Sequence, residues 1–111
     1  MKNIQFADYN TTIQFARYNT GQIAMQLIGA LESEYPGQPI ARATINVPEE
    51  TLAADETIIK DWAENTGIET ALIAAGVIEE EPVRHVMIGH VFAGVFRLTP
   101  NAIQAASQTT N

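Results

Sequence analysis

The sequence predicts one α+β domain, in which a mostly antiparallel sheet of five or six strands carries one short helix on a face. Its N-terminal part alternates apolar and polar residues, as strands with one buried face do. A single later stretch, residues 66–76, instead repeats apolar residues with the period of a helix. The chain of 111 residues, 46% of them hydrophobic and 17% charged, has the size of one domain with an ordinary core.

The first strands come from a near-repeat, in which residues 4–10 (IQFADYN) return as residues 13–19 (IQFARYN). Two copies of this length are too short for a solenoid, whose periods begin at about 20 residues. A two-residue loop at positions 10–11 would place Phe6 opposite Phe15 and keep the apolar side chains on one face. We therefore expect two neighbouring strands rather than a binding repeat.

The register of the third strand follows from the loop that precedes it. A three-residue loop ending at Gly21 pairs Phe15 with Met25 and Ile13 with Leu27. A two-residue loop would bring polar side chains into this layer, because a slip of one residue turns every side chain to the other face. Gly21 also suits the left-handed position that closes three-residue hairpins. The sequence therefore predicts an N-terminal three-stranded meander.

The middle of the chain is expected to contain a fourth strand, an acidic connector, a short strand and the helix, over residues 39–47, 48–56, 57–62 and about 67–75. Thr66 and Glu69 match a capping box at the start of the helix, and Gly76 matches a C-terminal glycine. So short a helix is unstable alone, so we expect it to pack on the sheet.

The final apolar region, residues 83–98, exceeds the usual strand length of about five or six residues. We expect a break at Gly89, and Gly94 is a candidate β-bulge. Residues 99–111 are polar and without a clear period, so we predict a flexible tail there. The expected domain is therefore residues 1–98.

Composition and charge exclude several classes of function. The chain has no cysteine, so it cannot form disulfides or cysteine-ligated metal sites. Its net charge of −7, with six scattered basic residues, disfavours binding to nucleic acid or to an anionic membrane. The charge would favour a basic protein partner, but the preferred interpretation is that it only keeps the protein soluble. The N-terminus lacks the apolar segment of a secretory signal, and the longest apolar stretch is shorter than the roughly 20 residues of a membrane span. We expect a cytoplasmic protein.

No catalytic, cofactor-binding or metal-binding residues are predicted. His85 and His90 would lie on opposite faces of one continuous strand, and no third ligand stands at a recognisable spacing. The sequence lacks a G-x-S-x-G nucleophile motif and the glycine-rich loops that bind phosphates. We therefore expect a protein that is not an enzyme and needs no cofactor.

The most notable polar patch contains Lys60, Asp61, Trp62, Glu64 and Asn65. In one interpretation Trp62 is an exposed anchor for a protein partner, since interface hot spots favour tryptophan with charged neighbours. In the other, Trp62 belongs to the core, and Glu64 and Asn65 shape the entry to the helix. The second interpretation is favoured, because a chain tends to bury its only tryptophan.

Several segments resemble a family of small uncharacterised proteins carried on bacterial conjugative elements, plasmids and related mobile DNA. The resemblance covers about residues 12–98 and rests on RYNTGQIAMQLI, PIARATINVP, DETIIKDWAENTGIETALIAAGVI and GHVFAGVFRL. The chain departs from the family at its IQFA repeat and in its polar tail. The resemblance implies a bacterial or phage accessory protein acting in the host cytoplasm, with no assigned activity and no functional residues to transfer.

These observations favour a non-enzymatic accessory protein that binds another protein through an acidic surface or a sheet edge. On a mobile element, such a protein could counter a host defence system by competing with DNA for a basic groove. The alternative is a small-molecule-binding domain or cryptic hydrolase with a pocket between helix and sheet. A third alternative is a homo-oligomer that assembles through the apolar stretch HVMIGHVFAGVF, residues 85–96.

Overall fold

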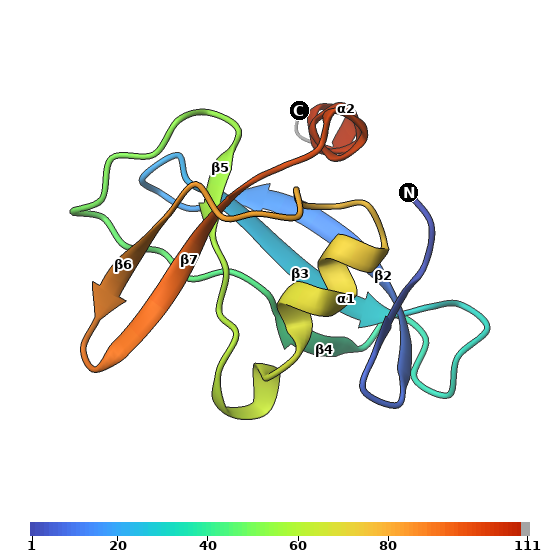
Figure 1. The fold of residues 1–111 in the computed structure, drawn as a ribbon. Coiled ribbons are helices and arrows are strands. Elements are labelled where there is room, and N and C mark those ends of the chain that lie inside the picture. The colour runs from blue at the N-terminus through green and yellow to red at the C-terminus, as the bar shows by residue number, and fades with distance from the viewer. Residues whose placement is uncertain (110–111) are drawn as a thin grey trace.

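The computed structural model describes residues 1–109 and confirms the α+β class (Figure 1). These residues form two antiparallel sheets of four and three strands, rather than one sheet of five or six. The first sheet has the order β1 (Ile4–Phe6), β2 (Tyr9–Arg17), β3 (Ile23–Gly29) and β4 (Pro39–Arg42). The second has the order β5 (Glu56–Ile58), β7 (Val91–Arg97) and β6 (Arg84–Ile88). The strands within each sheet are antiparallel to their neighbours.

The first hairpin turns earlier than the repeat predicts. Phe6 pairs with Tyr9 and Ile4 with Thr11, so the turn consists of Ala7 and the residue after it. The register expected from a loop at positions 10–11 is therefore wrong. The reason is Thr11, which is fully buried and donates its hydroxyl to the Ile4 carbonyl oxygen at 2.7 Å. Ala7 accepts a φ of 51° to close this tight turn, although that region is unfavourable for a residue with a Cβ.

The second hairpin has the predicted register. Phe15 pairs with Met25 and Ile13 with Leu27, and Gly21 adopts a positive φ of 88° in the loop. The apolar face of β1, β2 and β3 forms one side of the larger core cluster. The predicted meander therefore holds in strand order only, since its first turn is displaced and β4 extends the sheet to four strands.

The predicted fourth strand, residues 39–47, forms backbone hydrogen bonds with both sheets. The Ala43 N–H bonds to the Met25 carbonyl at 2.9 Å, which continues the first sheet. One residue later, Thr44 forms a bridge with Ile59, and the Ile45 N–H bonds to the Ile58 carbonyl at 3.2 Å. This segment therefore connects the first sheet to β5 of the second.

Helix α1 (Ile68–Ala74) packs against the first sheet, and a short 3₁₀ helix (Ala63–Asn65) precedes it (Figure 1). Ile68 and Leu72 are fully buried in the larger core cluster. The helix is followed by Gly76 with a φ of 74°, as expected for a C-terminal glycine. The predicted helix is confirmed within one residue at each end.

The C-terminal segment differs from the prediction, because Pro100–Thr109 form a second helix, α2. The prediction of a flexible tail over 99–111 does not hold for these residues, and its last two positions lie outside the described residues. Thr99 caps the helix, since its hydroxyl accepts the Ala102 N–H at 3.2 Å and donates to the Gly76 carbonyl at 2.6 Å. Ala102 is fully buried, so α2 packs against the body of the protein. Threonine followed by proline is itself a helix-start signal.

The apolar region over residues 83–98 is interrupted at Gly89, as predicted. It forms two strands, β6 and β7, which are joined by a turn at Gly89 and His90. Gly89 has the positive φ of 61° that this turn requires. The pairing runs without a register shift from Ile88 opposite Val91 to Arg84 opposite Val95, so the bulge considered at Gly94 does not occur.

The close contact between Gly29 and the loop that contains Tyr35, between β3 and β4, can be tested by substitution. An added Cβ would collide with the backbone carbonyl of Tyr35, so Gly29→Ala should destabilise the fold by about 2–3 kcal/mol. Gly21→Ala is the matched control, because it has free space and only a strained φ, at a cost of about 1 kcal/mol. Urea unfolding measures both losses. Equal losses would contradict a fixed contact between Gly29 and the Tyr35 loop.

Candidate functional site

The five residues proposed from sequence as a partner site lie around the start of α1, and most of them have structural roles. Asp61 accepts the Gly67 N–H with Oδ1 at 3.1 Å and the Glu69 N–H with Oδ2 at 2.8 Å. Its carboxylate therefore satisfies two of the free N–H groups at the helix N-terminus. The capping box predicted from Thr66 is wrong, since the Thr66 hydroxyl instead donates to the Ala63 carbonyl at 2.9 Å.

Asn65 and Trp62 face the interior to different degrees. Asn65 is 2% exposed and donates its side-chain N–H to the Arg42 carbonyl at 2.6 Å, which links the 3₁₀ helix to β4. Trp62 is half-buried and packs against the second core cluster, which is formed by Val47, Ile58, Val86, Ala93 and Val95. This agrees with the interpretation of Trp62 as a packing residue and leaves part of its surface open.

Lys60 and Glu64 form an ion pair of 3.1 Å at the surface. The Glu64 side chain is 70% exposed, so solvent screening makes such a pair weak. The structure thus brings all five residues together, but Asp61, Trp62 and Asn65 support the fold. A role of the patch in partner binding stays a prediction.

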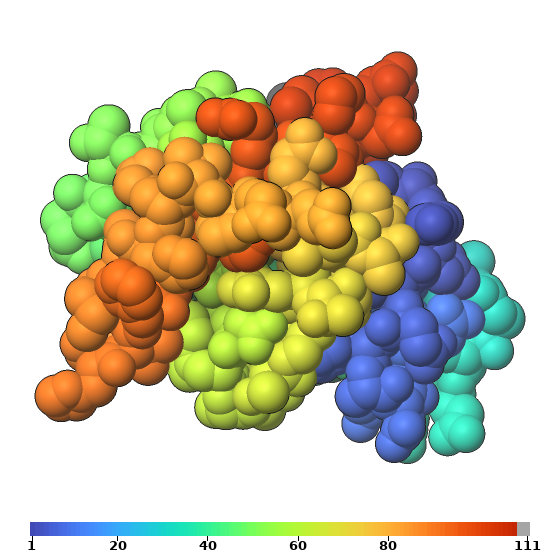
Figure 2. Space-filling view, in the orientation of Figure 1, coloured from blue at the N-terminus to red at the C-terminus, as the bar shows by residue number. Residues whose placement is uncertain are grey.

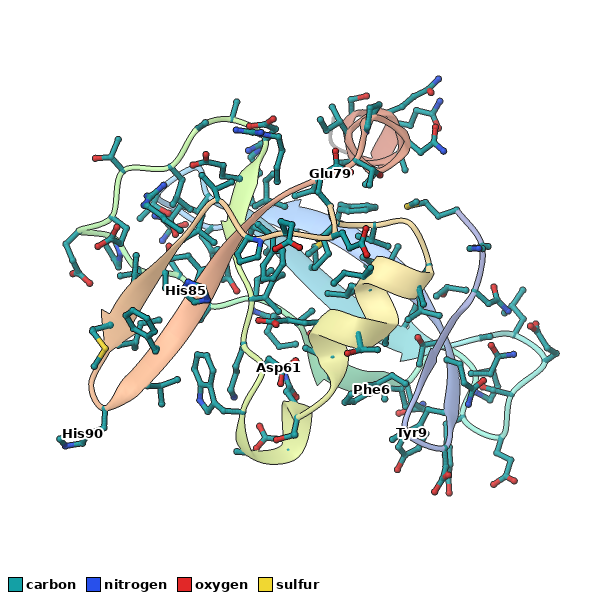
Figure 3. The ribbon with its side chains drawn as sticks, viewed as in Figure 1. Phe6, Tyr9, Asp61, Glu79, His85 and His90 are labelled. Carbon is teal, nitrogen blue, oxygen red and sulfur yellow. The ribbon has the colours of Figure 1, made fainter. Side chains whose placement is uncertain are left out.

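A more open surface lies on the face of the β6–β7 hairpin that carries His85, Met87 and Phe92, and we call these three residues the hairpin surface. His85 is labelled in Figure 3. Met87 and Phe92 are cross-strand partners and are 61% and 64% exposed. The rings of His85 and Phe92 stack, with centroids 5.0 Å apart and planes inclined by 13°. Because the two large apolar side chains are cross-strand neighbours and not scattered singly, they form a candidate interaction surface.

The opposite face of the hairpin anchors it. Val86, Ala93 and Val95 point into the second core cluster and are at most 8% exposed.

Two arginines on the hairpin form ion pairs with carboxylates of the acidic connector. Arg84 lies 3.6 Å from Glu50 and 3.5 Å from Glu56, and Arg97 lies 3.2 Å from Asp55. Sequence reasoning singled out this apolar stretch, but only the strand register shows which side chains face outward.

Glu69 lies at the inner end of the hairpin surface, where α1 meets β7. Its Oε2 lies 3.4 Å from the position that a Cβ on Gly94 would take, and Gly94 pairs with His85. Burial raises the pKa of Glu69, the negative charge of Asp61 raises it further, and His85 partly opposes the rise. Because burial disfavours the ionised form, this carboxylate costs stability when it is charged.

The structure shows no metal centre in the part of the chain that it describes. His85 lies in β6 and His90 in the hairpin turn, and Figure 3 shows their side chains well apart. No helix within residues 1–109 is long and apolar enough to cross a membrane.

Comparison of the chain with family models, with curated proteins and with solved structures finds no match.

The cap on α1 can be tested by substitution. Asp61→Ala should destabilise the protein by about 1–2 kcal/mol, because two backbone N–H groups lose their acceptor. Glu64→Ala is the control, since it removes only an exposed ion pair and should change little. Thermal unfolding compares the two. A loss for Asp61→Ala no larger than that for Glu64→Ala would show that water replaces the cap.

The raised pKa of Glu69 predicts a pH-dependent effect of Glu69→Gln. The cost of the charged carboxylate is absent below its unfolded pKa and grows as the pH rises through its higher folded pKa. The variant should therefore melt at a higher temperature than the wild type at pH 7, and this gain should vanish at about pH 4. Glu80→Gln, at an exposed position, should show no such gain. An equal gain of Glu69→Gln at both pH values would contradict this electrostatic origin.

Proposed function

We propose that the chain is a non-enzymatic accessory protein that binds another protein through the hairpin surface and the adjacent free edge of β6. The observation that carries this proposal is the exposure of Met87 and Phe92 on a hairpin whose strand β6, within residues 1–109, pairs only with β7 (Figure 1). An uncovered edge strand offers backbone N–H and C=O groups to a further strand. Exposed side chains beside it supply the pockets or anchors that make such strand addition selective.

The charge of the protein favours a basic partner. The chain carries a net charge of −7. Arg84 and Arg97, the two arginines of the hairpin, form ion pairs with Glu50, Asp55 and Glu56. They therefore add no net positive charge to the hairpin. An extended partner segment with apolar residues against Met87 and Phe92, and with lysine or arginine toward the acidic body, fits this surface. Electrostatic attraction of this kind speeds association and is weakened by salt.

The biological setting in this proposal comes from the resemblance to small proteins of conjugative elements and plasmids. A bacterial or phage accessory protein of this kind acts in the host cytoplasm. An acidic protein that binds a basic surface can occupy a groove that otherwise holds DNA, so interference with a host defence system is one activity consistent with the proposal.

The alternative of a small-molecule site or a cryptic hydrolase has less support. A hollow of about 740 Å³ lies over β2, β3 and β4, and it is lined by residues such as Gln14, Gln26 and Arg42. These side chains alternate with those that face the core and α1, so this hollow is not the expected pocket between helix and sheet.

The hairpin surface is tested with Phe92→Glu in affinity capture from a bacterial host lysate. The wild type should retain one stoichiometric partner, Phe92→Glu should lose it, and its melting temperature should be unchanged because Phe92 is 64% exposed. Ile103→Glu on α2 is the matched control, since Ile103 is also exposed and apolar but lies on another element. Retention of the partner by Phe92→Glu would overturn the proposed surface. A wild-type dimer in sedimentation that Phe92→Glu disrupts would assign the surface to self-association instead.

A further inference from the structure

A second pair of exposed aromatic residues, Tyr9 and Tyr35, belongs to the N-terminal segments (blue and cyan in Figure 2), which lie at the other end of the molecule from the β6–β7 hairpin. Tyr9 and Tyr35 are 40% and 50% exposed, and their ring centroids lie 6.1 Å apart with planes inclined by 58°. Figure 3 shows Tyr9 close to the first turn, far from His85 and His90. Neither tyrosine belongs to the core clusters, so neither is explained by packing in the interior.

Backbone contacts hold the two rings in place. Tyr9 begins β2, directly after the tight turn at Ala7. Tyr35 lies in the loop between β3 and β4, which folds back on Gly29: the Gly37 N–H bonds to the Gly29 carbonyl at 2.9 Å, and the Gln38 N–H bonds to the Tyr35 carbonyl at 3.1 Å. The absence of a side chain on Gly29 allows this close approach. The backbone positions of both tyrosines are therefore set by the fold.

The rings line a hollow of about 410 Å³ with an acidic rim. Its lining includes the carboxylate residues Asp8, Glu32 and Glu34 and no basic residue. One oxygen of Glu32 already accepts from the Asn3 and Asn10 side chains at 2.7 and 3.3 Å, which orients this carboxylate. Aromatic faces and carboxylates both attract cations, and here they share one hollow.

We propose that this hollow, which we call the tyrosine cleft, binds the alkylammonium group of a lysine side chain on a protein partner. The two ring centroids lie 6.1 Å apart, so a single cation can approach both within the roughly 6 Å over which cation–π attraction acts. The carboxylates add charge complementarity, and the rings contact the methylene groups of the lysine. The proposal is independent of the hairpin surface, because the two surfaces share no residue.

The test is an NMR titration of the whole protein with Nα-acetyl-lysine methylamide, its ε-trimethylated form and the neutral norleucine analogue. The lysine derivative should shift the backbone amides of Asp8, Tyr9 and Tyr35 with a dissociation constant of about 10 mM, as expected for one small cation at an open site. The norleucine analogue should bind at least about tenfold more weakly, because it keeps the apolar contact and lacks the charge. Tighter binding of the trimethylated form would assign the cleft to quaternary ammonium groups rather than to lysine and would overturn the proposed ligand.

Substitutions separate the aromatic contribution from damage to the fold. Tyr35→Ala should weaken binding at least about fivefold, and Tyr35→Phe should retain it, since the ring rather than the hydroxyl meets the cation. Glu34→Gln should weaken binding about two- to threefold and remove part of its salt dependence. Phe92→Glu should leave binding unchanged, so failure at the tyrosine cleft is distinct from failure at the hairpin surface. Equal binding by the norleucine analogue, or no saturable shift below about 50 mM, would overturn the proposal.

Discussion

Thr44 lies where the two sheets meet, and the architecture depends on the bonds that it makes there. Its hydroxyl accepts the Met25 N–H at 3.1 Å and lies 3.0 Å from the Tyr18 hydroxyl, while its backbone bridges to Ile59. A chain that leaves one sheet for another interrupts the ladder of backbone hydrogen bonds, and an unpaired group at a site that is 2% exposed would cost about 1–3 kcal/mol. The threonine hydroxyl replaces the missing acceptor, so the Met25 N–H stays hydrogen-bonded where the chain changes sheet.

Other buried polar side chains also form hydrogen bonds to backbone groups in the region where the two sheets meet. Gln22 accepts the Val47 N–H at 3.1 Å and donates to the Val47 carbonyl at 2.8 Å, so its amide acts as a neighbouring strand would. The Thr57 hydroxyl donates to the Ile23 carbonyl at 3.0 Å and connects β5 to β3. Within the described residues, each buried side-chain nitrogen and oxygen has a partner. These contacts set the orientation of the second sheet, and with it the direction in which the β6–β7 hairpin projects.

The two proposed binding surfaces share one physical design. Each places exposed aromatic side chains on a tight turn or hairpin whose backbone is anchored elsewhere: Phe92 over a buried apolar face, and Tyr35 over Gly29. A backbone that is already ordered loses little conformational freedom on binding, so more of the contact energy contributes to affinity. In both proposals, the acidic composition of the chain favours a basic partner.

The sequence by itself determined the elements that local patterns encode. The register of β2 against β3 followed from the alternation of apolar residues and from Gly21, and α1 followed from its period and from Gly76. Only the tertiary structure decided the features that depend on distant residues. The first turn lies earlier than predicted because Thr11 is buried, and Asp61 rather than Thr66 caps α1. The strands form two sheets rather than one, and Thr44 lies at the change of sheet. The candidate surfaces belong to the second group, because Tyr9 meets Tyr35 only after the loop folds on Gly29, and Phe92 faces outward only in the register that the core imposes.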